Sequence, residues 1–255
     1  MNLDKTQDVS VALVTGAARR IGAAIAERLH QAGFNVVIHC HDSRQEADAL
    51  SNKLNHLRAH SACVLVADLS LKNQACTLVK QAVDWQGRLD VLVNNASCFI
   101  KTPVRNIDLD GVDEAVWDKL WVTNVKAPLW LSEAAYACLA KHQGSIINIT
   151  DVHAEKPLSE YAVYAQTKAA LKMQTEALAR EYAPNIRVNA VAPGAIAWPE
   201  GENALSPQLQ KNIISKTLLK KHGEPKWIAE AVLSLVLNEF ITGQTLRVDG
   251  GRSLK

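Results

Sequence analysis

Cysteine is scarce in this 255-residue sequence, and its spacing excludes two kinds of site. The cysteines number five, are widely separated and contain no C-x-x-C pair; they are Cys40, Cys63, Cys76, Cys98 and Cys138. A disulfide-stapled domain or a structural zinc site would need cysteines at close, regular spacing. We therefore expect no metal site and a reducing compartment.

Long hydrophobic runs and basic clusters are also missing. No apolar segment approaches the roughly 20 residues needed to span a bilayer, and the polar start MNLDKTQDVS lacks the apolar core of a signal peptide. The net charge is only +2, and basic residues never occur more than two in a row. Nucleic-acid and membrane surfaces attract proteins with a stronger positive field. These absences predict a cytoplasmic protein that binds neither nucleic acid nor membrane.

What is present is a regular alternation of short apolar runs and helical patterns. Hydrophobic residues make up 48% of the chain, enough to bury a substantial core. Strands are predicted at residues 11–16, 34–39, 62–68, 89–94, 144–150, 186–192 and 244–251. Helices are predicted at residues 21–31, 45–57, 71–85, 112–142, 161–182 and 226–237. This order predicts one α/β domain over residues 1–255, a doubly wound, Rossmann-like parallel sheet of seven strands with helices on both faces.

The first strand leads into a turn suited to a pyrophosphate. Gly16 ends the strand, and Arg19-Arg20-Ile21-Gly22 opens the helix. Backbone N–H groups at a helix N-terminus bind anions, and glycine allows close approach of the chain. Arg20 stands where a dinucleotide-binding turn usually has its middle glycine. By itself, the pattern also fits an ordinary strand-to-helix turn.

The residues after the second strand bear on the choice of cofactor. If Cys40 occupies the discriminating position, no carboxylate is there to bind the ribose of NAD and repel the extra phosphate of NADP. Arg20, His41, Ser43 and Arg44 would then supply cations and donors for that phosphate. Asp42 could hold the ribose instead if the register shifts by one residue. We predict NADPH.

Other strand ends carry polar or aromatic residues that could face a ligand. Asp68 follows the third strand and could accept from an adenine amino group or cap the next helix. Asn95 follows the fourth strand, and Phe99 comes soon after it. Because ligands of open parallel sheets bind beyond the carboxyl ends of the strands, these residues and Asp151 should converge on one site.

A tyrosine and a lysine four residues apart form the candidate catalytic pair. In a helix, Tyr164 and Lys168 would stand on the same face, where the ammonium would lower the pKa of the phenol toward neutrality. Such a phenol could exchange a proton with a substrate. Taken alone, the pair is more often a half-buried tyrosine beside an exposed lysine, and it is the rest of the chain that favours a catalytic pair. Asn124, within the predicted helix 112–142, would be exposed unless its amide binds a bent backbone.

Together these motifs resemble the short-chain dehydrogenase/reductase family over nearly the whole chain. The resemblance rests on Thr15-Gly16-x-x-x-Arg20-x-Gly22, Asn94-Asn95-Ala96, Asn124, Tyr164-x-x-x-Lys168 and Pro193-Gly194. It implies that Tyr164 is the acid/base, that Lys168 lowers its pKa and holds the nicotinamide ribose, and that Asn124 holds a proton-relay water. The expected cofactor contacts are Gly16, Arg19, Arg20, Ile21, Gly22, His41, Ser43, Asp68, Leu69, Asn95, Ala96, Ser97, Thr150, Tyr164, Lys168, Pro193 and Gly194.

The departures from the family pattern resemble the pteridine reductases. The family normally has a serine thirteen residues before the tyrosine, where this chain has Asp151, which suits a nitrogen substrate better than a ketone. Arg20, the pattern His39-x-His41-x-Ser43 after the second strand, and the run Asn-Asn-Ala-Ser97-x-Phe99 add to the likeness. The resemblance implies that NADPH reduces a dihydropterin, that Phe99 stacks on the pterin, that Ser97 binds cofactor and substrate, and that Asp151 and Tyr164 manage the proton.

Two alternatives remain open, and two features extend beyond the site. The chain could be an NADPH-dependent carbonyl reductase of the 3-oxoacyl or sugar type, or a cofactor-binding regulator without catalysis. Residues 198–223 are polar and punctuated by proline and glycine at their start, which predicts a mobile lid. The wide apolar faces of helices 112–142 and 161–182 suggest burial against a partner, and the family resemblance implies a homotetramer.

Overall fold

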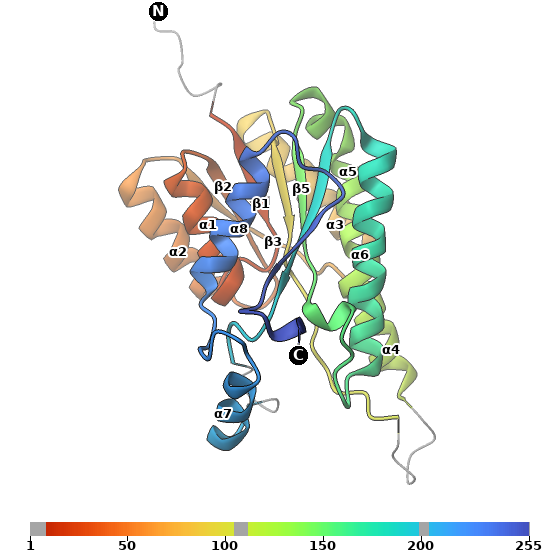
Figure 1. Ribbon diagram of the computed structural model, residues 1–255. Helices are drawn as coiled ribbons and strands as arrows, with labels where there is room; N and C mark the ends of the chain where they lie inside the picture. Colours follow the sequence, from red (N-terminus) through yellow and green to blue (C-terminus); the bar gives the residue numbers. More distant parts are fainter. Residues whose placement is uncertain (1–8, 105–111, 199–203, 255) are drawn as a thin grey trace, which may run out of the picture.

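The computed structural model describes residues 9–104, 112–198 and 204–254 and has one parallel sheet of seven strands (Figure 1). The strands are β1 (Val11–Val14), β2 (Asn35–Cys40), β3 (Ala62–Val66), β4 (Val91–Asn94), β5 (Ser145–Ile149), β6 (Arg187–Pro193) and β7 (Thr245–Val248). Their order across the sheet is β3-β2-β1-β4-β5-β6-β7, with parallel pairing throughout. The predicted doubly wound, Rossmann-like architecture is confirmed.

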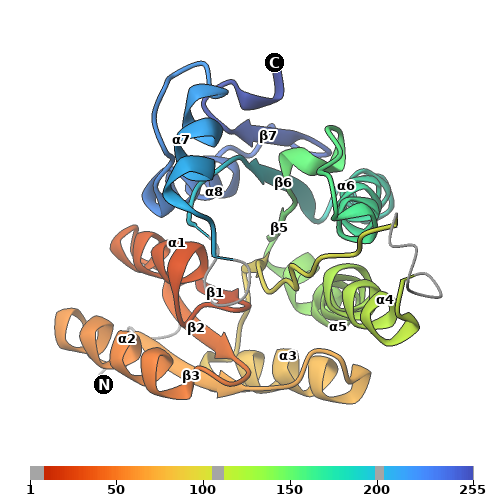
Figure 2. The same ribbon diagram turned by 90° about the horizontal axis from the view of Figure 1, so that it is seen from below.

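Helices cover both faces of the sheet, as Figure 2 shows from the end where the strands finish. One face carries α1 (Arg20–Gln31), α2 (Arg44–Leu57) and α8 (Pro225–Leu237), and the other carries α3 (Lys72–Gln86), α5 (Ala127–Lys141) and α6 (Ala162–Tyr182). Each face has its own buried core, one beneath α1, α2 and α8 and the other beneath α3, α5 and α6. Alternate residues of β1 point to opposite faces, so Ala12 and Val14 belong to the first of these cores and Val11 and Leu13 to the second. Two buried cores thus hold the strand ends in fixed positions.

The predicted helix 112–142 is interrupted near its middle. It consists of α4 (Glu114–Trp121), a π-helical turn η1 (Val122–Lys126) and α5. In an α-helix the carbonyl of Asn124 would accept from the N–H of residue 128, but residue 128 is proline and has none. The chain widens there, and the N–H of Ala127 donates to the carbonyl of Val122, five residues back. The prediction of a continuous helix missed this widening, which positions Asn124.

The segment between β6 and α8 lies at the carboxyl edge of the sheet (Figure 1). It contains α7 (Pro207–Ser215), and its two ends meet: the N–H of Gly223 donates to the carbonyl of Ala195, and the Trp198 ring stacks on His222 at 4.1 Å between centroids. The predicted lid corresponds to this segment, although residues 199–203 lie outside the described part. Across the described chain, no helix combines the length and apolar character needed to cross a membrane.

Candidate active site

A large cleft lies at the carboxyl edge of the sheet, the edge seen in Figure 2, and has a volume of about 1470 Å³. It is lined by the residues after β1, β2, β3, β4, β5 and β6 and by α6 and α7. The residues predicted to bind cofactor or substrate line it, except Arg44, which was predicted to bind the 2′-phosphate and does not line the cleft. Asp151, Tyr164 and Lys168 also line it. Asn124 does not line the cleft and lies behind its wall. The roles of these residues remain predictions, but the structure places them together.

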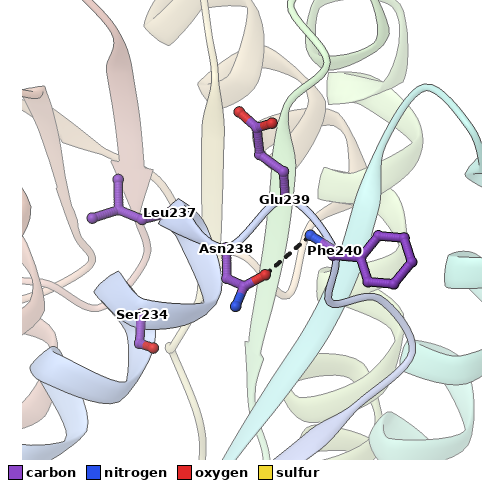
Figure 3. Close-up of a pocket in the computed structure, with 5 residues that line it drawn as sticks. All are labelled: Ser234, Leu237, Asn238, Glu239 and Phe240. Atoms are coloured by element: carbon purple, nitrogen blue, oxygen red, sulfur yellow. Dashed lines mark hydrogen bonds between the residues drawn. The ribbon is translucent and has the colours of Figure 1, made fainter.

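A second, shallower depression lies at the opposite edge of the sheet. It is formed at the end of α8 by Ser234, Leu237, Asn238, Glu239 and Phe240 (Figure 3). Asn238 Oδ1 accepts a hydrogen bond of 3.0 Å from the backbone N–H of Phe240, while the side chains of Leu237 and Phe240 point outward. This depression brings no set of catalytic groups together, so we assign the chemistry to the large cleft.

The turn after β1 is shaped for close approach of a ligand to the backbone. Gly16 has φ +60°, and a Cβ there would lie 3.0 Å from the Cα of Ala96. A Cβ on Gly22 would lie 2.2 Å from the carbonyl oxygen of Gly16. Asn95 Nδ2 donates to the carbonyls of Thr15 and Gly16 at 2.8 and 3.0 Å. These contacts leave no room for side chains at the two glycines and clamp the turn against the loop after β4.

Arg20 keeps a glycine-like backbone in this turn. Its φ is +55°, which costs a non-glycine residue roughly 1 kcal/mol. Its guanidinium donates to the carbonyls of Ala197 and Trp198 at 2.9 and 3.2 Å, on the segment that follows β6. Arg20 therefore lies on the β6 side of the turn, away from the residues after β2 that should receive a 2′-phosphate.

The corner after β2 contains charges that are already partly paired. Cys40 is the last residue of the strand and is buried, and Asp42 extends into solvent with Oδ2 3.2 Å from His41 Nδ1. Arg44 Nε donates to both carboxylate oxygens of Asp48 at 2.8 Å. The Arg19 guanidinium reaches toward the same corner and lies 3.7 Å from Glu46 in the first turn of α2. Arg19, rather than Arg20, therefore faces the predicted 2′-phosphate site.

Asp68 takes part in the local turn before α3. Its Oδ1 accepts from the N–H of Ser70 at 2.9 Å, and bonds from Ser70 lower the pKa of this carboxyl. The structure puts Leu71, not Asp68, at the N-cap of α3. Asp68 still lines the cleft, so an adenine contact stays open to it.

Asp151 and Tyr164 form the central polar pair of the cleft. The phenol of Tyr164 donates to Asp151 Oδ2 at 2.7 Å, and the backbone N–H of His153 donates to Oδ1 at 2.8 Å. The second bond caps the short 3₁₀ turn η2 (Val152–Ala154) and orients the carboxylate. Both carboxylate oxygens thus have donors, one of which is the phenol expected to act in catalysis.

The expected pKa of Tyr164 requires correction. Burial raises it well above its usual range, and the adjacent Asp151 carboxylate raises it further because a phenolate there would face a second negative charge. The predicted lowering of the Tyr164 pKa took account of Lys168 alone. Lys168 Nζ lies 5.7 Å from the centre of the Tyr164 ring and donates to the carbonyl of Ile149 at 3.0 Å. Burial lowers the pKa of Lys168 to about 8.

Asn124 is 1% exposed, and all the hydrogen-bonding groups of its side chain are engaged. Oδ1 accepts from Ser97 Oγ and from the N–H of Cys98, and Nδ2 donates to the carbonyl of Cys98 and to Thr167 Oγ1; the distances are 2.8 to 3.0 Å. These four bonds use both N–H groups of the amide nitrogen and both lone pairs of the amide oxygen. The side chain therefore braces the loop after β4 against α6, and a relay water would have to bind the main chain of Asn124.

Comparison with known proteins agrees with this geometry. Residues 16–253 match the family described as enoyl-(acyl carrier protein) reductase. The chain belongs to the short-chain dehydrogenase/reductase family. Its relatives include ketoacyl reductase 2 of the granaticin polyketide synthase from Streptomyces violaceoruber, 35% identical with 97% of each chain covered. Pteridine reductase 1 of Leishmania tarentolae is 34% identical with 96% of each covered, and 3-oxoacyl-[acyl-carrier-protein] reductase of Staphylococcus epidermidis is 34% identical with 94% and 97% covered.

Members of this family use a nicotinamide dinucleotide, and the cleft fits one. In the structure α1 begins without a side-chain cap, so the N–H groups of its first turn are available to a pyrophosphate. Gly16 and Gly22 let the turn after β1 pack tightly against Ala96 and Asn95, which fixes the backbone that would face the pyrophosphate. Thr150 lines the cleft, and its hydroxyl donates to the carbonyl of Val191 at 3.1 Å, which fixes the position of Oγ1.

Phe99 contacts two tyrosine rings in the cleft. It stacks on Tyr161, with ring centroids 4.3 Å apart and 13° between the planes, and makes a T-shaped contact with Tyr164 at 4.8 Å and 87°. These contacts fix the plane of the Phe99 ring. Tyr161 was not predicted to take part in the site, because its contact with Phe99 joins residues 62 positions apart.

Several other residues that were not predicted as site residues also line the cleft: His39, His153, Tyr161, Leu209, Ile213 and Arg252. His39 belongs to the His39-x-His41-x-Ser43 pattern, and Leu209 and Ile213 lie within the predicted lid 198–223, so the sequence offered a signal for these three. The position of His153, two residues after Asp151, was also a signal. Arg252 had none, since only tertiary packing brings it to the cleft.

Proposed function

We propose that this reductase is an NADPH-dependent pteridine reductase that converts a dihydropterin to the tetrahydropterin, with oxidised pterin or dihydrofolate as further substrates. The observation that carries the proposal is the 2.7 Å hydrogen bond from Tyr164 to Asp151. A carbonyl reductase needs donors aimed at the ketone oxygen. Here the position expected to hold a serine hydroxyl carries a carboxylate, which would repel that oxygen.

A ring nitrogen suits this pair better than a ketone. A carboxylate accepts from the N–H groups of a pterin, and in its protonated form it can donate to a ring nitrogen. When bound, NADPH would supply the hydride. The Asp151–Tyr164 pair holds a proton that can pass to the nitrogen, and the Lys168 ammonium stabilises the negative charge left behind. Phe99, held by Tyr161, would orient the flat ring.

The second candidate is a carbonyl reductase of the 3-oxoacyl or sugar type. It is favoured by the 35% identity to a ketoacyl reductase, which matches the 34% identity to a pteridine reductase. Overall identity therefore does not separate the two substrates. A non-catalytic regulator, the candidate of another class, has less support because Tyr164 and Lys168 are both buried in the cleft and oriented by hydrogen bonds.

The test is NADPH oxidation with dihydrobiopterin, dihydromonapterin and a 3-oxoacyl thioester in parallel. We expect turnover of a pterin and none of the thioester. In Asp151→Ser, pterin turnover should fall by about two to four powers of ten, the range for loss of a positioned proton donor or acceptor.

Asp151→Asn provides the matched control, because an amide oxygen can still accept from His153 but the side chain cannot carry the proton. It should fold normally and be as inactive as Asp151→Ser. Thioester turnover that rises in Asp151→Ser would identify a carbonyl reductase. Tight NADPH binding without turnover of any substrate would favour the regulator.

A further inference from the structure

A buried histidine joins two loops of the cleft, and neither the catalytic pair nor the cofactor prediction uses it. His39 is the penultimate residue of β2 and is 2% exposed. Its Nε2 lies 3.1 Å from the carbonyl of Ala67, just past β3. Its Nδ1 lies 3.1 Å from the backbone nitrogen of Gly16, just past β1.

The two partners define the state of the ring. A carbonyl oxygen can only accept, so Nε2 carries the hydrogen and donates to Ala67. Nδ1 is then the unprotonated nitrogen, which accepts from the N–H of Gly16. Burial lowers the pKa of His39 to about 4, so the ring is neutral near pH 7 and keeps both bonds. A charged ring would have a hydrogen at Nδ1 and would lose the bond to Gly16.

The loops that His39 joins are those predicted to hold opposite parts of the cofactor. Gly16 opens the turn for the pyrophosphate, and Ala67 precedes Asp68 and Leu69 on the adenine side. The main chain of His39 adds a third contact, since its carbonyl accepts from the N–H of Ala17 at 2.8 Å. Because Gly16 has positive φ and no side chain, its own backbone gives the turn little rigidity.

We infer that His39 is a positioning residue for the dinucleotide: its imidazole holds the turn after β1 and the loop after β3 at a fixed separation before the cofactor arrives. Preorganisation of this kind strengthens binding by reducing the ordering that binding must otherwise impose. The inference concerns features that NADPH and NADH share, so it is independent of the substrate and of the 2′-phosphate.

Two substitutions separate the two side-chain bonds. In His39→Asn, the amide oxygen lies as many bonds from Cβ as Nδ1 and can still accept from Gly16. In His39→Gln, the amide nitrogen corresponds to Nε2, so the bond to Ala67 can form but that to Gly16 is lost. His30→Gln is the control for loss of a buried histidine, because His30 binds Ser61 Oγ at 2.7 Å and does not line the cleft.

The experiment measures Kd for NADPH and NADH by fluorescence titration without substrate, and amide exchange of residues 11–25 in the cofactor-free protein. We expect His39→Gln to raise both Kd values about tenfold, which corresponds to ~1.4 kcal/mol, and to speed exchange in the turn. His39→Asn, which keeps the bond to Gly16 but loses the bond to Ala67, should raise both Kd values by a similar factor, because loss of either bond separates the two loops. In steady-state assays KM for NADPH should rise in His39→Gln while kcat at saturation changes little.

Unchanged Kd values in a folded His39→Gln or His39→Asn protein would overturn the inference, because each variant breaks the link between the two loops. If His30→Gln raised the Kd values as much as His39→Gln, the weaker cofactor binding would reflect general destabilisation of the fold and would also contradict the inference. If His39→Gln does not fold, faster exchange of the turn in His39→Asn with unchanged Kd would still contradict the role. Absence of pterin turnover would affect only the proposed function, since these titrations contain no substrate.

Discussion

Arg19 and Arg20 are adjacent in the chain, yet their guanidinium groups lie on opposite sides of the turn. Arg19 reaches Glu46 at the start of α2, whereas Arg20 binds carbonyls on the segment after β6. Only the first direction leads to the predicted 2′-phosphate site beside His41 and Ser43. The preference for NADPH, which we propose, should therefore depend on Arg19.

We expect Arg19→Ala to raise Kd for NADPH about five- to tenfold and Kd for NADH less than twofold. An exposed cation contributes about 1 kcal/mol to such a contact after solvent screening. Arg20→Ala should change both Kd values by similar factors, because its partners are main-chain carbonyls. Fluorescence titration with both cofactors makes the comparison. A selective loss in Arg20→Ala with none in Arg19→Ala would reverse the assignment.

At the scale of elements, the π-helical turn η1 places Asn124 where it can brace the loop after β4. Removing the amide leaves the N–H of Cys98 without its acceptor and leaves the hydroxyl of Thr167 with only its bond to the carbonyl of Tyr164. We expect Asn124→Ala to lower the free energy of unfolding by about 2–4 kcal/mol, as measured by urea denaturation, and to lower kcat per folded molecule.

Asn148→Ala is the matched control for this element. Asn148 is also a buried asparagine, bonded to Asn94 and Thr175 at 2.8 and 2.9 Å, but it does not line the cleft. It should lose similar stability and keep its kcat. If Asn124→Ala also kept its kcat, the side-chain hydrogen bonds of Asn124 would contribute to stability but not to catalysis.

At the scale of the whole molecule, exposed apolar side chains occur in two regions, called patches below. One region is on the helices α5 and α6, where Tyr136 is 38% and Met173 is 62% exposed. The other is beside the edge strand β7 and includes the fully exposed Phe240 and the exposed Leu246. A tetramer with two-fold symmetry needs two distinct self-complementary interfaces, and the homotetramer that the family resemblance implies could form through these two regions.

We expect light scattering to give a tetramer for the parent protein and a dimer for Met173→Glu or Phe240→Glu, because each charge would be buried in one interface. The double variant should be monomeric. Leu57→Glu is the control, since Leu57 is 69% exposed on α2 and belongs to neither patch. A monomeric parent protein, or tetramers in all variants, would contradict this arrangement.

The local pattern of the sequence was enough to predict the architecture and the location of the site. Apolar runs such as Val11–Val14 and the helical repeat around Tyr164 need only neighbouring residues to be recognised. The predicted and observed strand ends differ by at most three positions. Since parallel strands end at one edge, Gly16, Asp68, Asn95 and Asp151 converged on one cleft as predicted.

By itself, then, the sequence determined the doubly wound sheet and the residues of the cleft, because periodicity and strand order are local properties. Only the tertiary structure decided which way Arg20 points, how Asn124 joins Cys98 to Thr167, and that His39 joins Gly16 to Ala67. It also reversed the pKa shift expected for Tyr164. Hydrogen bonds, burial and the field of nearby charges depend on groups far apart in the chain, and packing alone brings those groups together.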